Sequence, residues 1–271
     1  AGGAVVGGDP VIGKPAEKPP RWALGTLKSV EKALTRFGDA PDGLGQVVVS
    51  ERDGGEMLVE SRDVAIISAT GSTRMGRAVG PKVAERFGRA ILELGGNNAM
   101  IVAPSADMAM ALRAIVFSAV GPTGQRCTSL RRLIVHEDIY DRLIPRLKAA
   151  YDTLPIGDPL ADGILVGPLI DGPAEEAMER GIARARAEGG VIHGGGRVLA
   201  DRYPNAHYVA PAIVEMPGQT DIVRRETFAP ILYAMKYRDL SDAIALHNDV
   251  PQGLSSCIFS TDVRETETFL S

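Results

Sequence analysis

One cysteine of this chain lies in a segment whose residue types suit nucleophilic chemistry. Cys127 belongs to the run Gly124-Gln125-Arg126-Cys127-Thr128, where a glycine gives the backbone freedom and an arginine can supply positive charge. A cysteine attacks as its thiolate, and an electropositive or polar neighbourhood favours that form. Backbone N–H groups beside Cys127 can stabilise the oxyanion that forms when a thiolate adds to a carbonyl. A lone free cysteine is more often a small buried hydrophobe, so the segment predicts a nucleophile only together with partners.

A carboxylate upstream of Cys127 is the candidate general base. Glu93 lies in a run of leucine and glycine, Leu92-Glu93-Leu94-Gly95. A glutamate that its neighbours desolvate becomes a stronger base and can take a proton from water. On the sequence alone, a surface glutamate at the end of a strand is the commoner case, so both interpretations stay open here.

The second cysteine and the histidines point to no further chemistry. Cys257 lies in the apolar run 254–259 and is interpreted as core packing. Two cysteines make no disulfide framework and suit a reducing compartment, which predicts a cytoplasmic protein. The four histidines are scattered and neither cysteine has metal-ligand spacing, so no metal site is expected.

A candidate phosphate-binding turn lies where a predicted strand meets a predicted helix. Gly71 ends the apolar run 64–68, and Ser72 begins a helical pattern that passes through Gly76. Backbone N–H groups and the helix dipole at such a junction favour a phosphate. The turn matches neither the dinucleotide fingerprint nor the P-loop. On the residues alone, simple helix capping by Ser72 is an equal alternative.

Taken together, these segments resemble the aldehyde dehydrogenase superfamily, and most closely its antiquitin-like branch of α-aminoadipic semialdehyde (piperideine-6-carboxylate) dehydrogenases. The segments that carry the resemblance run in family order along essentially the whole chain: Lys14-Pro15-Ala16-Glu17, Gly71-Ser72-Thr73-Arg74-Met75-Gly76, Glu93-Leu94-Gly95-Gly96-Asn97-Asn98, Gly124-Gln125-Arg126-Cys127-Thr128, Arg131-Arg132-Leu133 and Glu226-Thr227-Phe228-Ala229-Pro230.

The resemblance implies an oxidation of an aldehyde to a carboxylate with NAD, or alternatively NADP. Cys127 would form a thiohemiacetal and then a thioester, and Glu93 would activate the water that hydrolyses it. Arg126 would hold a charged substrate such as an amino-acid semialdehyde. The implied coenzyme contacts are the adenosine ribose on Lys14 and Glu17, the pyrophosphate on Gly71, Ser72 and Gly76, and the nicotinamide ribose and ring on Glu226 and Phe228.

The resemblance also implies that the chain is a central fragment of such an enzyme. The asparagine that completes the oxyanion hole is expected upstream of Lys14, and the aldehyde-anchoring loop and a sheet-extending tail are expected beyond Ser271. The chain begins at Ala1 without methionine, which fits a truncated or processed end. Full-length members of the family form homo-oligomers.

The pattern of short apolar runs and helical stretches predicts an α/β fold with parallel strands. Together with this pattern, the resemblance implies a partial doubly wound NAD-binding domain over residues 1–95 and a C-terminally incomplete α/β catalytic domain over 96–271. The predicted helices cover residues 20–37, 72–87, 107–120, 137–151 and 174–188. The predicted strands lie at 46–49, 64–68, 99–103, 133–135, 208–214, 231–237 and 256–260.

Composition limits the binding partners of this chain. The net charge of −4, without a basic block, disfavours nucleic acid, and no apolar run is long enough for a membrane span.

Two rival functions stay open beside the aldehyde dehydrogenase. One rival is a truncated, catalytically impaired nucleotide-binding or interaction protein. The other is an enzyme that passes the thioester to coenzyme A, which Glu93 argues against because a base that activates water would hydrolyse the thioester first.

Overall fold

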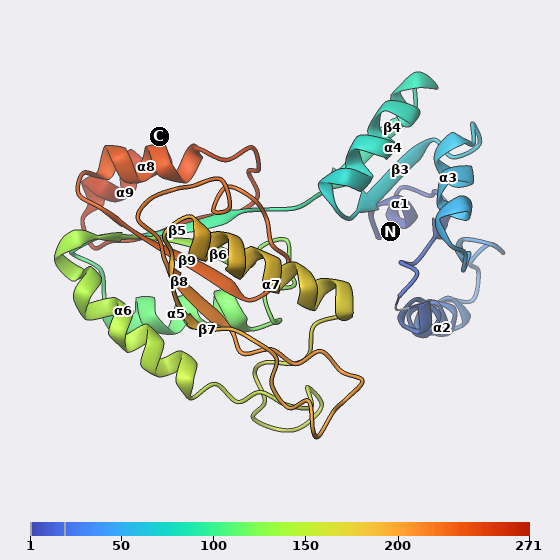
Figure 1. Cartoon of the computed structure of the whole chain (residues 1–271). Helices are drawn as coiled ribbons and strands as arrows, with labels where there is room; N and C mark the ends of the chain where they lie inside the picture. Colours follow the sequence, from blue (N-terminus) through green and yellow to red (C-terminus); the bar gives the residue numbers. More distant parts are fainter. Residues whose placement is uncertain (1, 19) are drawn as a thin grey trace. The chain divides into compact units, whose positions relative to one another are not determined.

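The computed structural model describes residues 2–18 and 20–271, and the chain divides into two compact units, Ala1–Leu94 and Gly95–Ser271 (Figure 1). The division falls between residues 94 and 95, one position before the boundary expected from the sequence. Each unit is described by itself below.

The first unit alternates helices and short strands. Its strands pair in two separate parallel pairs, β1 with β2 and β3 with β4, where the sequence suggested one continuous partial sheet. Its elements are α1 (Gly2–Val6), β1 (Val11–Gly13), α2 (Pro20–Phe37), β2 (Gly45–Val47), α3 (Arg52–Glu60), β3 (Ile66–Thr70), α4 (Thr73–Glu85) and β4 (Arg89–Glu93).

A small apolar cluster under β3 and β4 holds α4 in place. Val59, Ile67 and Val83 are buried there, with one side chain each from α3, β3 and α4. The helix α4 begins where the sequence predicted, because Ser72 caps it by accepting a hydrogen bond from the Met75 N–H group at 3.1 Å. The turn between β3 and α4 is thereby fixed at the carboxyl end of β3.

The second unit is built on a six-stranded sheet in the order β10-β5-β6-β9-β8-β7. All neighbouring strands run parallel except the edge strand β7, which is antiparallel to β8. Its elements are β5 (Asn98–Val102), α5 (Met108–Val120), β6 (Leu130–His136), α6 (Glu137–Asp152), α7 (Gly172–Ala187), β7 (Val191–Gly194), β8 (Ala212–Glu215), β9 (Ile231–Tyr237), α8 (Leu240–Asn248), β10 (Ser256–Phe259) and α9 (Val263–Leu270).

Helices cover both faces of this sheet, so the central strands are buried on both sides (Figure 1). Along β5, Met100 and Val102 pack into the cluster that contains α5 and α6, whereas Ala99 and Ile101 pack into the cluster that contains α7 and α8. This explains why β5 and β6 are apolar without alternation, as is usual for parallel strands between two helix layers. The α/β class with parallel strands predicted from the sequence is confirmed.

The parallel arrangement brings four distant segments to one edge of the sheet. The segments that enter β5, β6, β9 and β10 all arrive at the amino ends of these strands, which lie at the same edge because the strands are parallel. The Cys127 run is the segment that enters β6. Candidate chemistry in this unit therefore lies at the amino edge, whereas ligands of open α/β sheets usually bind at the carboxyl edge.

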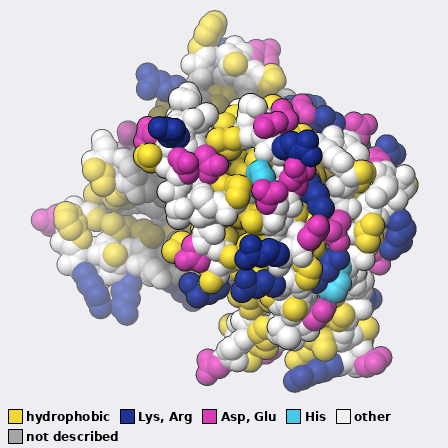
Figure 2. Space-filling view, turned by 90° about the vertical axis from the view of Figure 1, so that its left-hand side faces the viewer, with side chains coloured by type: hydrophobic (Ala, Val, Ile, Leu, Met, Phe, Trp, Pro, Cys, Tyr) yellow, Lys and Arg dark blue, Asp and Glu magenta, His cyan; other side chains and the backbone are white. Residues whose placement is uncertain are grey.

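The surface of the second unit carries charges of both signs. On the face shown in Figure 2, basic and acidic side chains are interspersed and do not gather into one basic area. Among the described residues, no helix combines the length and the apolar character needed to cross a bilayer.

Candidate functional site

The Cys127 loop, defined here as residues 121–129, connects α5 to β6 through a tight turn. Thr123 and Gly124 both have positive φ, 57° and 65°. A β-carbon on Gly124 would lie 2.4 Å from the carbonyl group of Ala229 and 2.6 Å from the nitrogen of Pro230. Glycine is therefore required here for two reasons, its left-handed backbone and the close approach of the segment that enters β9.

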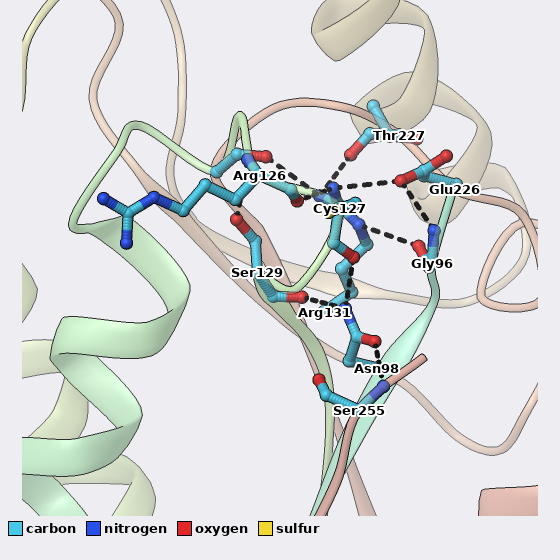
Figure 3. A network of polar contacts seen from close by, with 10 residues as sticks. Gly96, Asn98, Arg126, Cys127, Ser129, Arg131, Glu226, Thr227 and Ser255 are labelled. Carbon is cyan, nitrogen blue, oxygen red and sulfur yellow. Dashed lines mark hydrogen bonds and ion pairs between the residues drawn. The ribbon is translucent and has the colours of Figure 1, made fainter. Parts of the chain in front are cut away.

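Asn98 holds the part of the loop from Cys127 to Ser129. Its Nδ2 donates to the carbonyl oxygens of Cys127 at 2.7 Å and Ser129 at 2.8 Å, while its Oδ1 accepts from the Ser255 N–H group at 3.1 Å (Figure 3). Asn98 is buried and is the first residue of β5. One amide side chain therefore joins the segments that enter β5, β6 and β10.

Arg131 holds the part of the loop that precedes Cys127, and it lies at the centre of the network in Figure 3. Its side chain is 2% exposed, and burial lowers its pKa while the nearby Glu226 carboxylate opposes that shift. Its guanidinium contacts Glu226 Oε1 at 3.3 Å and donates to four carbonyl oxygens, those of Gly96 (3.3 Å), Gly124 (3.1 Å), Arg126 (3.0 Å) and Thr227 (2.8 Å).

These bonds leave Cys127 with a free thiol and a free backbone N–H group. The thiol is half-buried and unpaired. Within the described residues, the N–H groups of Cys127 and Thr128 have no hydrogen-bond acceptor, whereas the Arg126 N–H donates to the Ser129 hydroxyl. Two unpaired N–H groups next to a thiol form an arrangement suited to an oxyanion. The Arg126 side chain is exposed and extends away from the network (Figure 3).

Glu226 and Phe228 lie on the other side of Arg131. Glu226 Oε1 accepts from the Gly96 N–H group at 3.2 Å as well as from Arg131, and its side chain is 18% exposed. The Phe228 ring lies 5.3 Å from the Arg131 guanidinium carbon and is 46% exposed. The two side chains therefore reach the same guanidinium, and the aromatic ring stays partly exposed.

The remaining candidate residues belong to the first unit, where Lys14 and Glu17 follow β1 and the Ser72 turn and Glu93 lie at the carboxyl ends of β3 and β4. Lys14, just after β1, donates to Glu17 at 3.0 Å, and this contact helps to lower the Glu17 pKa after the larger effect of a backbone hydrogen bond. The Gly71 N–H group donates to the Glu93 carbonyl at 2.9 Å, which joins the Ser72 turn to the end of β4.

Gly76 has a packing role that the sequence did not reveal. A β-carbon at this position would lie 2.5 Å from a methyl group of Leu94. The glycine therefore allows α4 to approach the chain just beyond β4, and its backbone lies one turn into the helix, away from the unpaired N–H groups of the first turn. The expected contact of Gly76 with a pyrophosphate stays a prediction, and the packing gives this glycine a second role in positioning the helix.

The expected desolvation of Glu93 is not met within its own unit. Glu93 is the last residue of β4 and its side chain is exposed. The run around it is apolar in sequence, but strand geometry points alternate side chains to opposite faces, so Leu92 and Leu94 turn away from the carboxylate. Proximity in sequence to leucine does not desolvate a strand residue.

The two cysteines differ in their surroundings, and this difference gives a prediction. Cys257 lies in β10 against the core cluster, and burial raises its pKa. Because the thiolate is the reactive form, we expect iodoacetamide near neutral pH to alkylate Cys127 several-fold faster than Cys257 in the folded chain. Peptide mapping by mass spectrometry over time measures both rates in one sample, and equal or faster labelling of Cys257 would refute this ranking.

A cavity of about 400 Å³ lies beside the loop network and shares Asn98 and Ser255 with it. Its other lining side chains include those of Arg132 and His247, which are both buried. Burial lowers the pKa of His247. No group of three or more histidine, cysteine or acidic side chains in the described residues has the geometry to hold a metal ion.

Sequence reasoning assigned no role to Asn98 or Arg131, which organise the loop. The signal for Arg131 was nevertheless present. Arg131 and Arg132 are consecutive charged residues inside the otherwise apolar run of β6, and both are almost fully buried. Arginine is rarely buried unless its donors are satisfied, so such a pair indicates a built polar network.

The whole chain matches a known protein family. The family model described as "Aldehyde dehydrogenase family" matches residues 1–271. A Caenorhabditis elegans homolog of aldehyde dehydrogenase family 7 member A1 is 44% identical over 264 residues, which are 96% of this chain and 49% of that protein. The alpha-aminoadipic semialdehyde dehydrogenase of Bos taurus is 38% identical, over 96% of this chain and 48% of its own length.

Solved structures show the same likeness. The gamma-glutamyl-gamma-aminobutyraldehyde dehydrogenase of Burkholderia cenocepacia superposes with a TM-score of 0.93 at 31% identity, over 99% of this chain and 54% of its own. PnpE from a Pseudomonas species, solved in complex with nicotinamide adenine dinucleotide, superposes with a TM-score of 0.92 at 30% identity, over 99% and 54%. The chain thus spans about half the length of the relatives that it matches.

Proposed function

The chain belongs to the aldehyde dehydrogenase family, and we propose that it carries the nucleophile and most coenzyme contacts for the NAD-dependent oxidation of an aldehyde to a carboxylate. The observation that supports this best is the Cys127 loop. Its carbonyl groups accept hydrogen bonds from Asn98 and Arg131. Among the described residues, the Cys127 thiol and the N–H groups of Cys127 and Thr128 have no hydrogen-bond partner. This is the arrangement that thiol addition to a carbonyl requires.

In the proposed reaction, the Cys127 thiolate attacks the aldehyde carbon, a C–S bond forms, and the carbonyl oxygen becomes an oxyanion near the free N–H groups. The nicotinamide of NAD, when bound, supplies a hydride acceptor that turns this adduct into a thioester. Water then attacks the thioester carbon, Glu93 takes a proton from that water, and the C–S bond breaks to release the acid and the Cys127 thiolate.

The first unit supports the proposal through residues that suit a dinucleotide. The α4 N-terminus has first-turn N–H groups that no helical carbonyl can reach, and Gly71 and Ser72 lead into it at the carboxyl end of β3. Lys14 and Glu17 already contact each other and together offer a donor and an acceptor to a ribose diol. We assign NAD on the likeness to a neighbour solved with that coenzyme, and NADP is the alternative.

In the second unit, we assign Glu226 and Phe228 to the nicotinamide half of the coenzyme. Glu226 Oε1 is occupied by Gly96 and Arg131, so a ribose hydroxyl would bind the other oxygen, Oε2, or displace one of these donors. The exposed face of Phe228 offers an apolar surface for the nicotinamide ring.

For the substrate we propose an aldehyde that also bears a carboxylate. The Arg126 guanidinium has no acceptor among the described residues and lies one position before the nucleophile. A free guanidinium binds a carboxylate with two parallel hydrogen bonds. Relatives named alpha-aminoadipic semialdehyde dehydrogenase act on a substrate of this class, which supports the same assignment here.

Arg126→Met tests this assignment. We expect the KM for α-aminoadipic semialdehyde to rise about 10-fold to 100-fold, since a charge-assisted bidentate pair contributes roughly 1.5–3 kcal/mol. The KM for propanal, which has no carboxylate, should stay within about twofold. Steady-state NADH formation measures both. Equal effects on the two aldehydes would exclude Arg126 as the carboxylate contact.

The same assay separates the proposed function from its rivals. Turnover that does not depend on coenzyme A supports hydrolysis of the thioester, and turnover that requires coenzyme A supports acyl transfer. Calorimetric binding of NAD without NADH formation would indicate a nucleotide-binding protein that has lost catalysis.

A further inference from the structure

We propose that Arg131 is a positioning residue for the Cys127 nucleophile: its guanidinium holds the backbone of the Cys127 loop so that the thiol and the neighbouring N–H groups keep one fixed orientation. The inference rests on the proposed function, because it assigns Arg131 a part in the attack by Cys127. Arg131 itself contacts no reacting atom.

The Arg131 guanidinium binds the backbone of the Cys127 loop on the N-terminal side of the nucleophile. It donates to the carbonyl oxygens of Gly124 and Arg126, which both precede Cys127 in the chain. Asn98 grips the carbonyl oxygens of Cys127 and Ser129 from the other side. The carbonyl groups around Cys127 are thereby held, while the N–H groups of Cys127 and Thr128 have no acceptor among the described residues.

The same guanidinium also binds acceptors outside the Cys127 loop. It donates to the carbonyl oxygens of Gly96 and Thr227 and to the Glu226 carboxylate. Gly96 enters β5 and Thr227 precedes β9, so one planar group joins the Cys127 loop to two neighbouring segments. A lysine ammonium has three donors on a flexible stem and cannot span this set, whereas the five donors of arginine lie in a fixed plane.

The neighbouring Arg132 does not share the hydrogen-bond partners of Arg131. Arg132 is equally buried, but its partners are the carbonyl oxygens of Asn97, Leu246 and His247 and the Gln219 side chain. None of these lies in the Cys127 loop. Two adjacent buried arginines therefore bind different regions: Arg132 binds the C-terminal turn of α8, Gln219 and Asn97, and Arg131 binds the Cys127 loop and the Glu226 segment. Consecutive strand residues point to opposite faces, which leaves Arg131 as the one of the two that contacts the Cys127 loop.

The test compares two reactions of the same thiol. Acylation by p-nitrophenyl acetate forms an oxyanion and therefore depends on the orientation of the N–H groups, whereas alkylation by iodoacetamide is a simple displacement that does not. The ratio of the two rates at Cys127 cancels changes in thiolate fraction and in access. For Arg131→Met we expect this ratio to fall about 10-fold to 100-fold, the usual cost of a misplaced nucleophile or a lost oxyanion donor.

Arg131→Lys and Arg142→Met complete the design. Arg131→Lys keeps the charge and should still show a ratio reduced at least fivefold; it also decides the question if Arg131→Met does not fold. Arg142 is exposed on α6 with no polar partner among the described residues, so Arg142→Met should keep the ratio of the unmodified chain. Melting temperature and Cys257 labelling in each variant report loss of the fold.

The possible outcomes test the role of Arg131 and the proposed function separately. A ratio within twofold of the unmodified chain in a folded Arg131 variant overturns the positioning role, and so does full recovery with lysine, because charge alone would then suffice. If the unmodified chain is not acylated at Cys127 at all, the proposed function fails, and the role of Arg131 falls with it.

Discussion

Replacing Cys127 with alanine is expected to reduce aldehyde-dependent NADH formation and acylation by p-nitrophenyl acetate by at least about 10³-fold, to the background rate. The covalent route has no substitute among the described residues, because the other thiol lies in β10 with a pKa raised by burial. When an enzyme loses its nucleophile, it keeps only the contribution of binding and of oxyanion stabilisation. Initial rates of NADH absorbance and of p-nitrophenolate release measure the loss.

Cys257→Ala is the matched control for that variant. It removes the same atoms from the other free cysteine, at a half-buried position, and should cost about 1 kcal/mol of stability or less. Both activities should stay within about twofold of the unmodified chain. If Cys257→Ala abolished activity and Cys127→Ala preserved it, the assignment of the nucleophile would be wrong.

Gly124→Ala is expected to destabilise the chain by roughly 3–5 kcal/mol and to disorder the Cys127 loop. Part of the effect is backbone strain, since φ is +65° and an L-residue there costs about 1–2 kcal/mol. The larger part is steric, because the new β-carbon would lie 2.4 Å from the backbone of Ala229, which cannot rotate away as a side chain can. Thermal or urea unfolding of the variant, followed by circular dichroism, measures the change in the free energy of unfolding.

Gly163→Ala separates strain from collision. Gly163 also has positive φ, +79°, but a β-carbon there meets no atom within 4 Å. We therefore expect it to cost only the strain of about 1–2 kcal/mol and to leave Cys127 acylation unchanged. Equal losses in the two variants would mean that the contact between the Cys127 loop and the segment at Ala229 does not matter for stability.

Much of the fold could be predicted because local signals agreed with the final packing. The helix α2 follows the predicted range 20–37, and α6 ends one residue beyond the predicted 137–151. The predicted helix 107–120 forms as α5, and the Asp107 carboxylate caps it by accepting from the N–H groups of Ala109 and Met110. Strong periodicity and a clear cap are enough to define a helix when both are present.

The elements that were missed have weaker local signals. The helix α3 contains Gly54 and Gly55, which lower helix propensity, and its formation depends on packing against the β3–β4 cluster. The helices α8 and α9 are eight or nine residues long. The strand β6 was predicted only over 133–135, yet it extends over Leu130–His136, because carbonyl oxygens from other segments satisfy the two buried arginines that would otherwise interrupt it.

The candidate site could be predicted only in part, for a related reason. The motif residues were named from the sequence, and their roles stay proposals. The network that positions them depends on contacts between distant residues, such as Arg131 with Glu226, 95 positions apart, and Asn98 with Ser255, 157 positions apart. No local pattern encodes such pairs. For Glu93 the sequence left an exposed glutamate and a desolvated base both open; the side chain is exposed in its own unit, because neighbours along a strand point to opposite faces.

Peptide mapping after a brief exposure of the chain to p-nitrophenyl acetate tests the central claim, that Cys127 is the nucleophile, most directly. In this reaction the thiolate displaces p-nitrophenolate and keeps the acetyl group as a thioester, a miniature of the proposed intermediate. We expect one acetyl group per chain, on the peptide that contains Cys127, and hydroxylamine should remove it. An acetyl group found on Cys257 or on lysines, with Cys127 unmodified, would contradict it.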